Sequence, residues 1–441
     1  MRNTRTWLGG IAALAAVGTV AALSAPALQR AATDTPRTYT TPRLVTGKEL
    51  TPRGHQTDVG SFPANLVLSP DGRFALVTDA GAREALSVLR VSDGQRVSQL
   101  DWNAPSPVFK GKKQALYYGL VCGPTVAGQT PVYASRGAEG TISVLSLAAD
   151  GALTDTGKTM GGSEPRAFYA GLALSRDGKK LYAADNSADP KRGMRSFLNV
   201  IDTNTNTVTA RVDVPGYPYA VAALANDAKV YVSSEQRSTV SVVDPASGKV
   251  VREIATGTQP MALALDRSQR RLFVANAGSD TVSIVDTNTD QVTRTLLLRP
   301  DDARGLPGST PTGLALAPDE KRLYVTLGDM NSVAVVDLPK GTLAGYVPVG
   351  WYPTAVAVSP DAKRLFVANA KGVAIRNPND KPVAGLTSQA QYIQNIIEGT
   401  VSTLDLGTLP PLKTLTAQAL ANNQGRLSPK APFQNPGIRH V

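Results

Sequence analysis

A sequence unit that recurs seven times along this chain constrains its fold more than any other feature. Each copy opens with a run of small apolar residues, passes through a polar turn, and reaches a second apolar run. The opening halves of six copies read PANLVLSPDGRFALVTD (63–79), GLALSRDGKKLYAADN (171–186), PYAVAALANDAKVYVSS (218–234), PMALALDRSQRRLFVAN (260–276), PTGLALAPDEKRLYVT (311–326) and PTAVAVSPDAKRLFVAN (353–369). A more divergent copy begins at Leu116. The motif prolines, at positions 63, 165, 218, 260, 311 and 353, advance by roughly 40–50 residues per repeat, the length of a four-stranded propeller blade.

The second half of each copy is an apolar run that ends in aspartate, followed by a more polar run. Examples are LNVIDTNTNTVTARV (198–212), TVSVVDPASGKVVREI (239–254) and TVSIVDTNTDQVTRTL (281–296). A short carboxylate at the end of a strand can start a turn by bonding the backbone ahead of it, whereas a Ca²⁺ site needs several carboxylates that converge. We therefore expect turn formation, and no metal site, at the recurring aspartates: Asp202, Asp244, Asp286, Asp337 and Asp405.

Seven copies of four short strands predict an all-β fold, a seven-bladed β-propeller over residues 43–406. The first strand of each blade should be the crowded inner one, because its residues are small. The second should be buried on both faces, because it is continuously apolar. The seventh copy ends without a fourth strand, so residues 43–51 (RLVTGKELT) are expected to supply it and close the ring. The alternative is that this segment is a tail without regular structure.

Both ends of the chain differ from the repeats. Residues 1–27 have the features of a signal peptide, with two arginines, an apolar Ala-rich stretch and a small-residue cleavage site; the alternative is an uncleaved signal anchor. Residues 28–42 form a linker, and residues 407–441 form a tail that is helix-prone at TAQALANN (416–423) and Pro-rich beyond it. We expect an exported protein, in the periplasm, the cell envelope or outside the cell, with no membrane span after cleavage.

The longer connections of the predicted propeller gather on one face. With the strands of a blade lettered A to D from the inside, a meander places the A–B and C–D turns on one face and the B–C and D–A loops on the other. Residues 101–114, 149–164 and 299–310 are predicted as D–A loops, and residues 187–196 and 371–398 as B–C loops. Loops presented together by a rigid scaffold commonly carry function. This face, called the loop face below, is therefore the predicted interaction surface.

The formal net charge of +11 suits anionic partners. Arginine and lysine next to aromatic rings can bind phosphate or single-stranded nucleic acid. Candidate side chains of this kind on the loop face are Arg83, Arg136, Arg192, Arg195, Arg237, Lys371, Tyr217, Tyr219, Trp351 and Tyr352. Acidic residues in the same loops, among them Glu84, Glu235 and Asp329, would neutralise much of this field. Ordinary solvated surface charge is therefore the alternative.

The sequence lacks the patterns of familiar catalytic and cofactor sites. Its two histidines, His55 and His440, lie at opposite ends of the sequence and have no second ligand at metal-binding spacing. Its single cysteine, Cys122, excludes an intrachain disulfide, a Cys-based zinc site and CxxCH haem attachment. There is no G-x-S-x-G elbow, P-loop or dinucleotide fingerprint. We therefore expect no enzyme activity, no metal and no cofactor.

The repeats resemble the YVTN family of β-propellers, also called YncE-like, through LYVT (323–326), LFVAN (272–276 and 365–369) and the strands TVSVVD and TVSIVD. The resemblance covers residues 60–406 and implies a seven-bladed ring. The sequence is more similar still to the propeller half of bacterial proteins that join such a ring to an alkaline-phosphatase-like phosphoesterase, through VGWYPTAVAVSPDAKRLFVANAKG (349–372), EGTVSTLDL (398–406) and PGIRHV (436–441). In that family the metal ligands and nucleophile lie in the phosphoesterase domain that follows, so none of them can be carried over to this sequence.

We expect a non-catalytic, monomeric binding or scaffold module whose loop face binds an unidentified protein or anionic ligand. The first alternative is a hydrolase role, as the propeller part of a phosphoesterase whose catalytic domain is missing here or encoded separately. Further alternatives are a propeller lactonase, which needs acidic or histidine ligands near the channel, and a nucleic-acid-binding propeller. The aromatic content of only 5% disfavours the latter. Fold alone does not choose among these functions.

Overall fold

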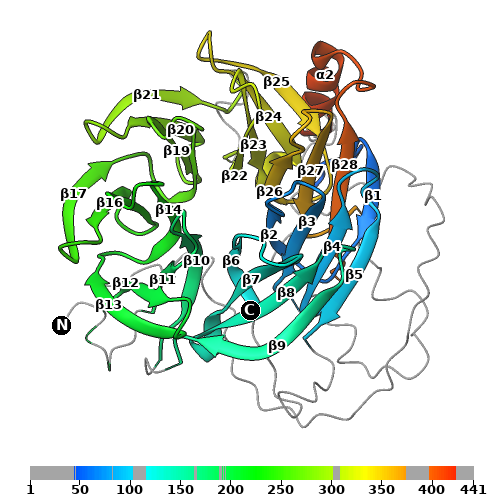
Figure 1. Cartoon of the computed structure of the whole chain (residues 1–441). Helices are drawn as coiled ribbons and strands as arrows, with labels where there is room; N and C mark the ends of the chain where they lie inside the picture. The colour runs from blue at the N-terminus through cyan, green and yellow to red at the C-terminus, as the bar shows by residue number, and fades with distance from the viewer. Residues whose placement is uncertain are drawn as a thin grey trace, which may run out of the picture. The chain divides into compact units, whose positions relative to one another are not determined.

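Seven four-stranded antiparallel sheets surround a central opening in the computed structural model of the chain (Figure 1). The structure describes residues 44, 46–81, 83–102, 116–162, 166–187, 191, 193, 195–300, 308–373 and 397–423. The inner strand of each blade packs against that of the next, and β26 (Pro353–Val358) of blade 7 packs against β2 (Pro63–Leu68) of blade 1. The ring is therefore closed, and the predicted seven-bladed β-propeller is confirmed.

Six blades are built from four consecutive strands that run from the inside outwards in chain order. Blade 1 comprises β2, β3 (Phe74–Asp79), β4 (Ala85–Arg90) and β5 (Arg96–Asp101). Blade 2 comprises β6 (Leu116–Cys122), β7 (Gln129–Arg136), β8 (Thr141–Ala148) and β9 (Leu153–Met160). Blade 3 comprises β10 (Tyr169–Leu174), β11 (Lys180–Asp185), β12 (Phe197–Asp202) and β13 (Thr207–Asp213).

The next three blades repeat this order. Blade 4 comprises β14 (Pro218–Ala223), β15 (Val230–Ser234), β16 (Thr239–Asp244) and β17 (Lys249–Ala255). Blade 5 comprises β18 (Pro260–Leu265), β19 (Arg271–Asn276), β20 (Thr281–Asp286) and β21 (Gln291–Leu297). Blade 6 comprises β22 (Pro311–Leu316), β23 (Arg322–Leu327), β24 (Ser332–Asp337) and β25 (Thr342–Pro348). Short 3₁₀ turns, η1 (Gly137–Glu139) and η4 (Gly328–Met330), follow the second strands of blades 2 and 6.

Blade 7 takes its outer strand from the other end of the sequence. Its strands β26, β27 (Arg364–Asn369) and β28 (Thr400–Asp405) are completed by β1 (His55–Asp58), which pairs antiparallel with β28. An N-terminal strand thus closes the ring as predicted, but residues 43–51 are not that strand. Leu44 and Leu50 are buried there, and the Glu49 N–H donates to the Asn422 carbonyl over blade 6. The chain therefore reaches the edge of blade 7 only at residue 55.

Burial within a blade follows the sequence pattern. All six residues of β3 are buried, and so are five of the six in β27, as their continuous apolar runs predict. The Asn369 side chain at the end of β27 donates to the Ser402 hydroxyl (2.9 Å) of β28, and Asn276 donates to Ser283 (3.0 Å) in the same way. The last residue of the LFVAN motif therefore ties the second strand to the third.

The recurring aspartates form turns, as predicted. Asp202 Oδ1 accepts the Asn204 and Thr205 backbone N–H groups (2.8 and 3.0 Å), and Asp286 does the same with Asn288 and Thr289. These backbone bonds favour the ionised form and lower the pKa of both carboxyls.

Blade 2 departs from the sequence prediction because its repeat is divergent. Residues 149–164, predicted as a D–A loop, contain β9, whose alternating polar pattern belongs to a half-exposed outer strand. The remaining D–A connection is correspondingly short. Blade 3 also begins later than its motif proline suggested, because Tyr169 pairs with Asp185 where Pro218 pairs with Ser234 in blade 4.

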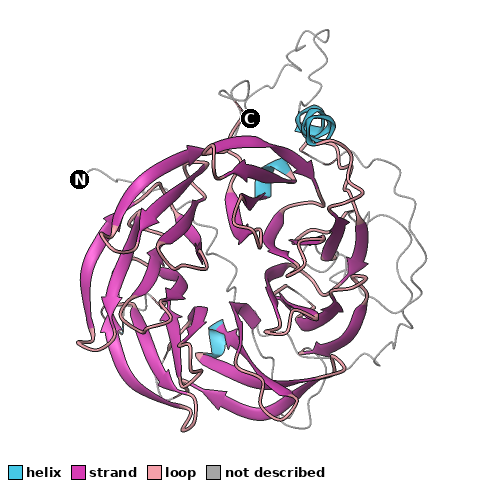
Figure 2. Cartoon of the chain, turned by 45° about the horizontal axis from the view of Figure 1, so that its top comes forward, coloured by secondary structure: helices cyan, strands magenta, loops and turns pink. Residues whose placement is uncertain are grey.

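One helix, α2 (Leu412–Asn423), lies on the outside of the ring (Figure 2). It packs on β25, with Leu415 and Ala419 fully buried in the clusters around blade 6. The Tyr346 N–H of β25 donates to the Thr416 hydroxyl of the helix (2.9 Å). The predicted C-terminal helix is thus present, and no helix in the described parts of the chain is long and apolar enough to cross a membrane.

Candidate functional site

The loop face of the ring is held together by one recurring hydrogen bond. In six blades the residue before the inner strand uses its carbonyl to accept the N–H of the first residue after the second strand; the pairs are Phe62 with Ala80, Phe168 with Asn186, Tyr217 with Glu235, Gln259 with Ala277, Thr310 with Gly328, and Tyr352 with Ala370. Five of these residues (Phe62, Tyr217, Gln259, Thr310 and Tyr352) have positive φ. Because this backbone conformation and hydrogen bond recur around the ring, they belong to the propeller architecture and are not peculiar to one blade. It presents the D–A and B–C residues together at the mouth of the channel.

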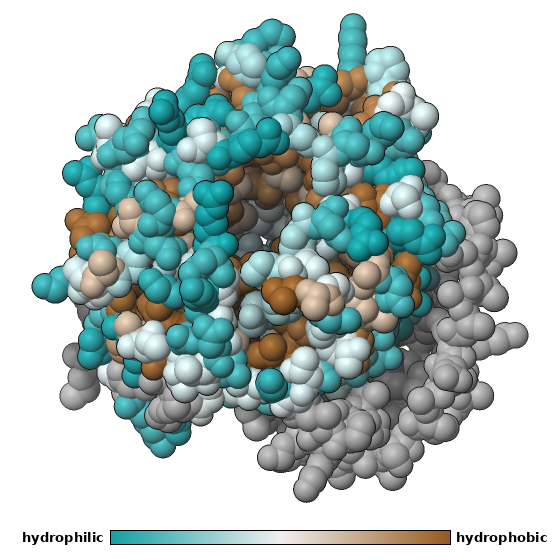
Figure 3. Space-filling model, in the orientation of Figure 1, coloured by the Kyte–Doolittle hydropathy of each residue, from teal (hydrophilic) through white to brown (hydrophobic). Residues whose placement is uncertain are grey.

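Four aromatic rings from three blades gather at that mouth. Tyr118 (β6) and Tyr219 (β14) stack with ring centroids 4.4 Å apart and planes at 29°. Tyr117 (β6) meets Phe168, which precedes β10, edge to face at 4.9 Å and 75°. All four rings are half-buried, and the space-filling view shows a hollow at the ring centre with hydrophobic residues in its wall (Figure 3). Together with Glu235 these four residues are called the aromatic mouth.

The four rings are not part of the interior that holds the blades together. Seven clusters of buried apolar side chains fill the spaces between blades, and none of them includes Tyr117, Tyr118, Phe168 or Tyr219. Their neighbours Leu116 and Tyr169 are in those clusters instead. The four rings thus lie outside the apolar clusters, on the inner strands β6 and β14 and just before β10.

The phenols of these tyrosines share raised pKa values, chiefly because the rings are buried. Burial raises the pKa of Tyr219 well above its usual value, and Tyr117, Tyr118, Glu235 and Tyr352 raise it further. Burial and then Glu235 raise the pKa of Tyr117 to about 12. Glu235 follows β15 directly, and burial raises the pKa of its carboxyl as well. The tyrosines are therefore neutral donors at ordinary pH, around a half-buried acid.

A second cluster lies at blades 6 and 7. The Lys371 ammonium sits 5.0 Å from the Trp351 ring centre and 4.8 Å from that of Tyr352, within the range of cation–π attraction. Burial lowers the pKa of Lys371, and the Asp329 carboxylate partly opposes that shift. Tyr352 also makes a small contribution to the raised pKa of Tyr219.

The arginines predicted for an anion site do not converge on one point. Arg83 pairs with Glu398 (3.6 Å), the buried Arg136 pairs with Glu139, and Arg195 pairs with Asp213. Arg237 is exposed and packs over Gly216, while Arg192 lies outside the described residues.

Of the predicted aromatics, Tyr217, Trp351 and Tyr352 stand just before the inner strands β14 and β26, and Tyr219 is the second residue of β14. Sequence reasoning missed the roles of Tyr117, Tyr118 and Phe168, and it treated Glu235 only as a neutralising charge. The available signal was the Tyr-Tyr pair of 117–118, which stands where the inner strands β22 and β26 carry Thr312-Gly313 and Thr354-Ala355. Because that repeat diverges from the others, its alignment with the other inner strands could not be read from the sequence.

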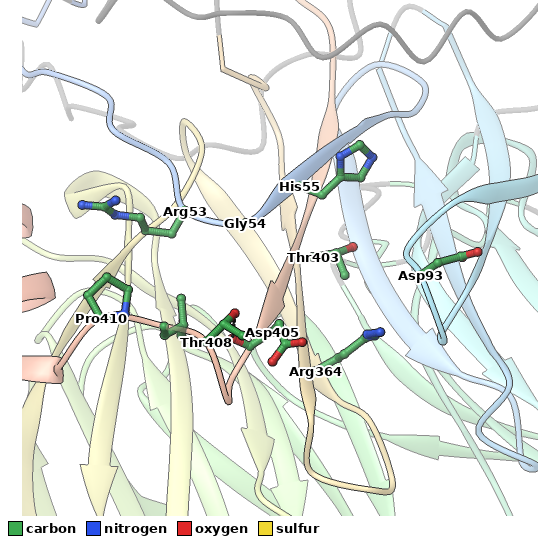
Figure 4. Close-up of a pocket in the computed structure, with 10 residues that line it drawn as sticks. Arg53, Gly54, His55, Asp93, Arg364, Thr403, Asp405, Thr408 and Pro410 are labelled. Atoms are coloured by element: carbon green, nitrogen blue, oxygen red, sulfur yellow. Dashed lines mark hydrogen bonds between the residues drawn. The ribbon is translucent and has the colours of Figure 1, made fainter.

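A separate hollow of about 390 Å³ lies on the opposite face, between blades 7 and 1 (Figure 4). Its wall mixes basic side chains of Arg53, His55 and Arg364 with the acids Asp93 and Asp405. Arg364 Nε donates to the Val91 carbonyl (3.2 Å) across the blade junction. These residues connect blade 7 with blade 1, and their opposite charges leave no strongly charged patch. Among the described residues there is no group of three or more His, Cys, Asp or Glu that could hold a metal ion.

Comparison with known proteins agrees with this architecture. Residues 190–307 match the family described as YNCE-like beta-propeller, and this segment runs through blades 3 to 5 of the ring. Over that segment the chain is similar to this family, and the fold of the whole ring is a seven-bladed β-propeller. Comparison of the chain with curated proteins gives no significant match.

Solved structures share the ring at low sequence identity. Kuenenia stuttgartiensis hydrazine synthase is 18% identical with a TM-score of 0.56, and the match covers 72% of this chain and 96% of that chain. A streptogramin B lyase structure is 12% identical with a TM-score of 0.55, over 80% of this chain and 97% of that chain. At such identities the similarity shows the β-propeller fold alone.

Proposed function

We propose that this YNCE-like propeller is a non-catalytic binding module and that its ligand or partner binds on the loop face, at the aromatic mouth. The observation that carries the proposal is the group of four half-buried rings at the channel, outside every hydrophobic cluster of the core. Ligand sites are concave and mostly apolar, with a few convergent polar groups. Glu235 and the tyrosine hydroxyls are such groups here.

A thermal-shift screen of small molecules tests the proposal. A ligand that binds only the folded chain raises Tm, and the rise continues with the logarithm of ligand concentration above Kd. We expect Tyr219→Ala to abolish the shift produced by a hit, because that substitution removes one half of the Tyr118–Tyr219 stack. Val251→Ala, at a side chain 56% exposed on the outer strand β17, is the control and should leave the shift unchanged. Hits that survive Tyr219→Ala would place the binding site elsewhere.

Export is part of the same proposal and rests on the signal-like residues 1–27, which lie outside the described part of the chain. Intact-mass measurement of the protein recovered from the envelope or medium of an expressing bacterium tests it. We expect a chain that begins near residue 28. Recovery of the full chain from the cytoplasm alone would contradict export.

Association with a phosphoesterase, as a further domain or a separate protein, stays a prediction from the sequence resemblance. It is tested by assaying phosphatase activity that co-purifies with the propeller from its natural source. Activity that separates from the propeller on gel filtration would count against it.

A further inference from the structure

We infer that the hollow between blades 7 and 1 binds a small organic carboxylate, whose negative charge is held by the guanidinium groups of Arg53 and Arg364. The hollow lies on the face opposite the loop face, so this inference goes beyond the proposed function and does not depend on it. Three observations carry it: the construction of the hollow, the bonding of its two arginines, and the bonding of its two acids.

Cross-strand neighbours of blade 7 form one wall of the hollow. His55 of β1 stands opposite Thr403 of β28. Arg364 of β27 stands opposite Asp405, two residues further along β28. Side chains two residues apart in a strand point to the same face, so these four share one face of the sheet. Residues 408–410 add part of the lining, and the volume of about 390 Å³ is that of a small-molecule site.

Arg53 lines the hollow just before β1 and brings an uncommitted charge to it. Its backbone is fixed, because its N–H donates to the Pro348 carbonyl (3.1 Å) and its carbonyl accepts the Gln56 side-chain amide (3.1 Å). Within the part of the chain that the structure describes, the half-buried guanidinium has no hydrogen-bond or ion-pair partner, and its Nε is buried. Burial of a charged donor without an acceptor is unfavourable, so a bound carboxylate would relieve that cost.

Arg364 brings a second guanidinium to the hollow, across Asp405 and Thr408 from Arg53 in the view of Figure 4. Its Nε donates to the Val91 carbonyl of blade 1 (3.2 Å), which fixes the side chain at the blade junction. The described residues include no ion-pair partner for it, so its terminal N–H groups are available to a ligand. A guanidinium can bind a carboxylate through two parallel N–H···O bonds.

The acids of the hollow do not neutralise both arginines. Asp93 pairs with Arg90 (3.0 Å) and also accepts the Gln95 N–H (3.0 Å). Asp405 accepts the Gly407 N–H (2.9 Å), and its carboxylate has no ion-pair partner among the described residues. Two arginines and one unpaired acid leave a single positive charge in the lining. That balance matches a ligand with one negative charge, such as a carboxylate, and disfavours a doubly charged phosphate ester.

Benzoate, benzyl alcohol and phenyl phosphate are the matched probes, because they share one aromatic ring and differ in charge. Binding of each to the full chain is measured by ligand-observed NMR titration at pH 7 and low ionic strength. We expect benzoate to bind with a Kd of about 1 mM. The neutral alcohol should bind about tenfold more weakly, because it forms no charge-assisted hydrogen bond.

Arg53→Gln should weaken benzoate binding about tenfold, whereas Arg53→Lys, which keeps the charge and loses the paired donors, should weaken it less. Both variants should fold, since the Arg53 side chain bonds to none of the described residues. Arg176→Gln is the control for net charge, because Arg176 is exposed in the A–B turn between β10 and β11, on the same face of the ring at blade 3. It should leave benzoate binding unchanged. Circular dichroism verifies the fold of each variant.

Equal affinity for benzoate and benzyl alcohol would overturn the inference, because the hollow would then select no charge. Tighter binding of phenyl phosphate than of benzoate would also overturn it and would assign the hollow to a phosphate ester. Equal weakening by Arg53→Gln and Arg176→Gln would show that benzoate responds only to net charge. Absence of binding at about 100 mM benzoate, far above a millimolar Kd, would show that the hollow takes no carboxylate. None of these results bears on the loop face, which the thermal-shift screen tests through Tyr219→Ala.

Discussion

A Cβ atom on Gly171 would lie 2.3 Å from the carbonyl oxygen of Tyr219, so the inner strands of blades 3 and 4 are in direct backbone contact. The preceding residue, Ala170, has no exposed surface. Blade 3 therefore presents only small side chains at the level where blades 2 and 4 carry Tyr118 and Tyr219. Rings from two blades that are not neighbours can meet for this reason.

The close contact at Gly171 predicts a specific cost of adding one methyl group. Gly171→Ala should push β10 and β14 apart, lower the free energy of unfolding by about 1–3 kcal/mol, and reduce the near-ultraviolet circular dichroism of the stacked tyrosines. Gly162→Ala is the control, because its Cβ would meet Thr141 at an ordinary 3.4 Å. Urea denaturation compares the two variants. Equal free energies of unfolding for the two variants would show that β10 and β14 can move apart at no cost, which would contradict the prediction.

Ring closure predicts a difference between two glycines with the same backbone conformation. Gly54 and Gly47 both have φ of +79°, but a Cβ on Gly54 would lie 2.3 Å from the Thr403 carbonyl oxygen, whereas nothing lies within 4 Å of one on Gly47. Both alanine variants should lose about 1 kcal/mol from the left-handed backbone. Gly54→Ala should lose more, because it displaces β1 from β28.

The readout for this pair is Tm together with aggregation on heating, since a displaced β1 exposes the edge of β28. Indistinguishable Tm and aggregation for Gly54→Ala and Gly47→Ala would contradict a closing role for β1.

Removing the Asn369 side chain should lower the free energy of unfolding, because it breaks the link between the second and third strands of a blade. Its side chain is fully buried and donates to the Ser402 hydroxyl at 2.9 Å. Asn369→Ala leaves buried polar groups without a partner and should cost about 1–3 kcal/mol. Asn204→Ala, at an exposed turn position, should change stability by less than about 0.5 kcal/mol. Chemical denaturation measures both, and similar values would rule out a structural role for the motif asparagine.

The buried carboxyl of Asp79 should make the stability of the protein depend on pH. Complete burial raises its pKa to about 8, although bonds from the Gly60 N–H and the Ser87 hydroxyl and the charges of Arg96 and Arg83 oppose the shift. The unfolded chain loses this proton near pH 4 and the folded chain near pH 8. Between these values the folded state binds the extra proton, so the free energy of unfolding should fall as pH rises.

Asp79→Asn keeps the shape of the side chain and removes the titration. The stability of the original protein relative to Asp79→Asn should therefore decline between about pH 4 and pH 8, as measured by Tm in matched buffers. A constant difference across that range would show that Asp79 ionises normally in the fold.

Features written within one repeat were predictable. The small inner strand, the buried second strand and the turn aspartates depend on residues a few positions apart, and the structure places Asp202, Asp286 and β3 as expected. Because the same local pattern occurs in seven copies, the sequence alone predicted seven blades. The missing fourth strand of the last copy predicted closure by an N-terminal strand.

Contacts between blades were not predictable, because they join residues whose separation and register no repeat encodes. In blade 2, Leu116 and Leu120 take the pairing positions that Pro218 and Val221 take in blade 4, so four residue steps replace three and one extra residue enters the strand. The extra residue places two successive tyrosines at the channel. Packing of blades 2, 3 and 4 then brings them to Phe168 and Tyr219. The ring thus follows from turns and strands that each repeat encodes through residues close together in the sequence. The candidate site forms only in the folded protein, because its side chains come from different blades.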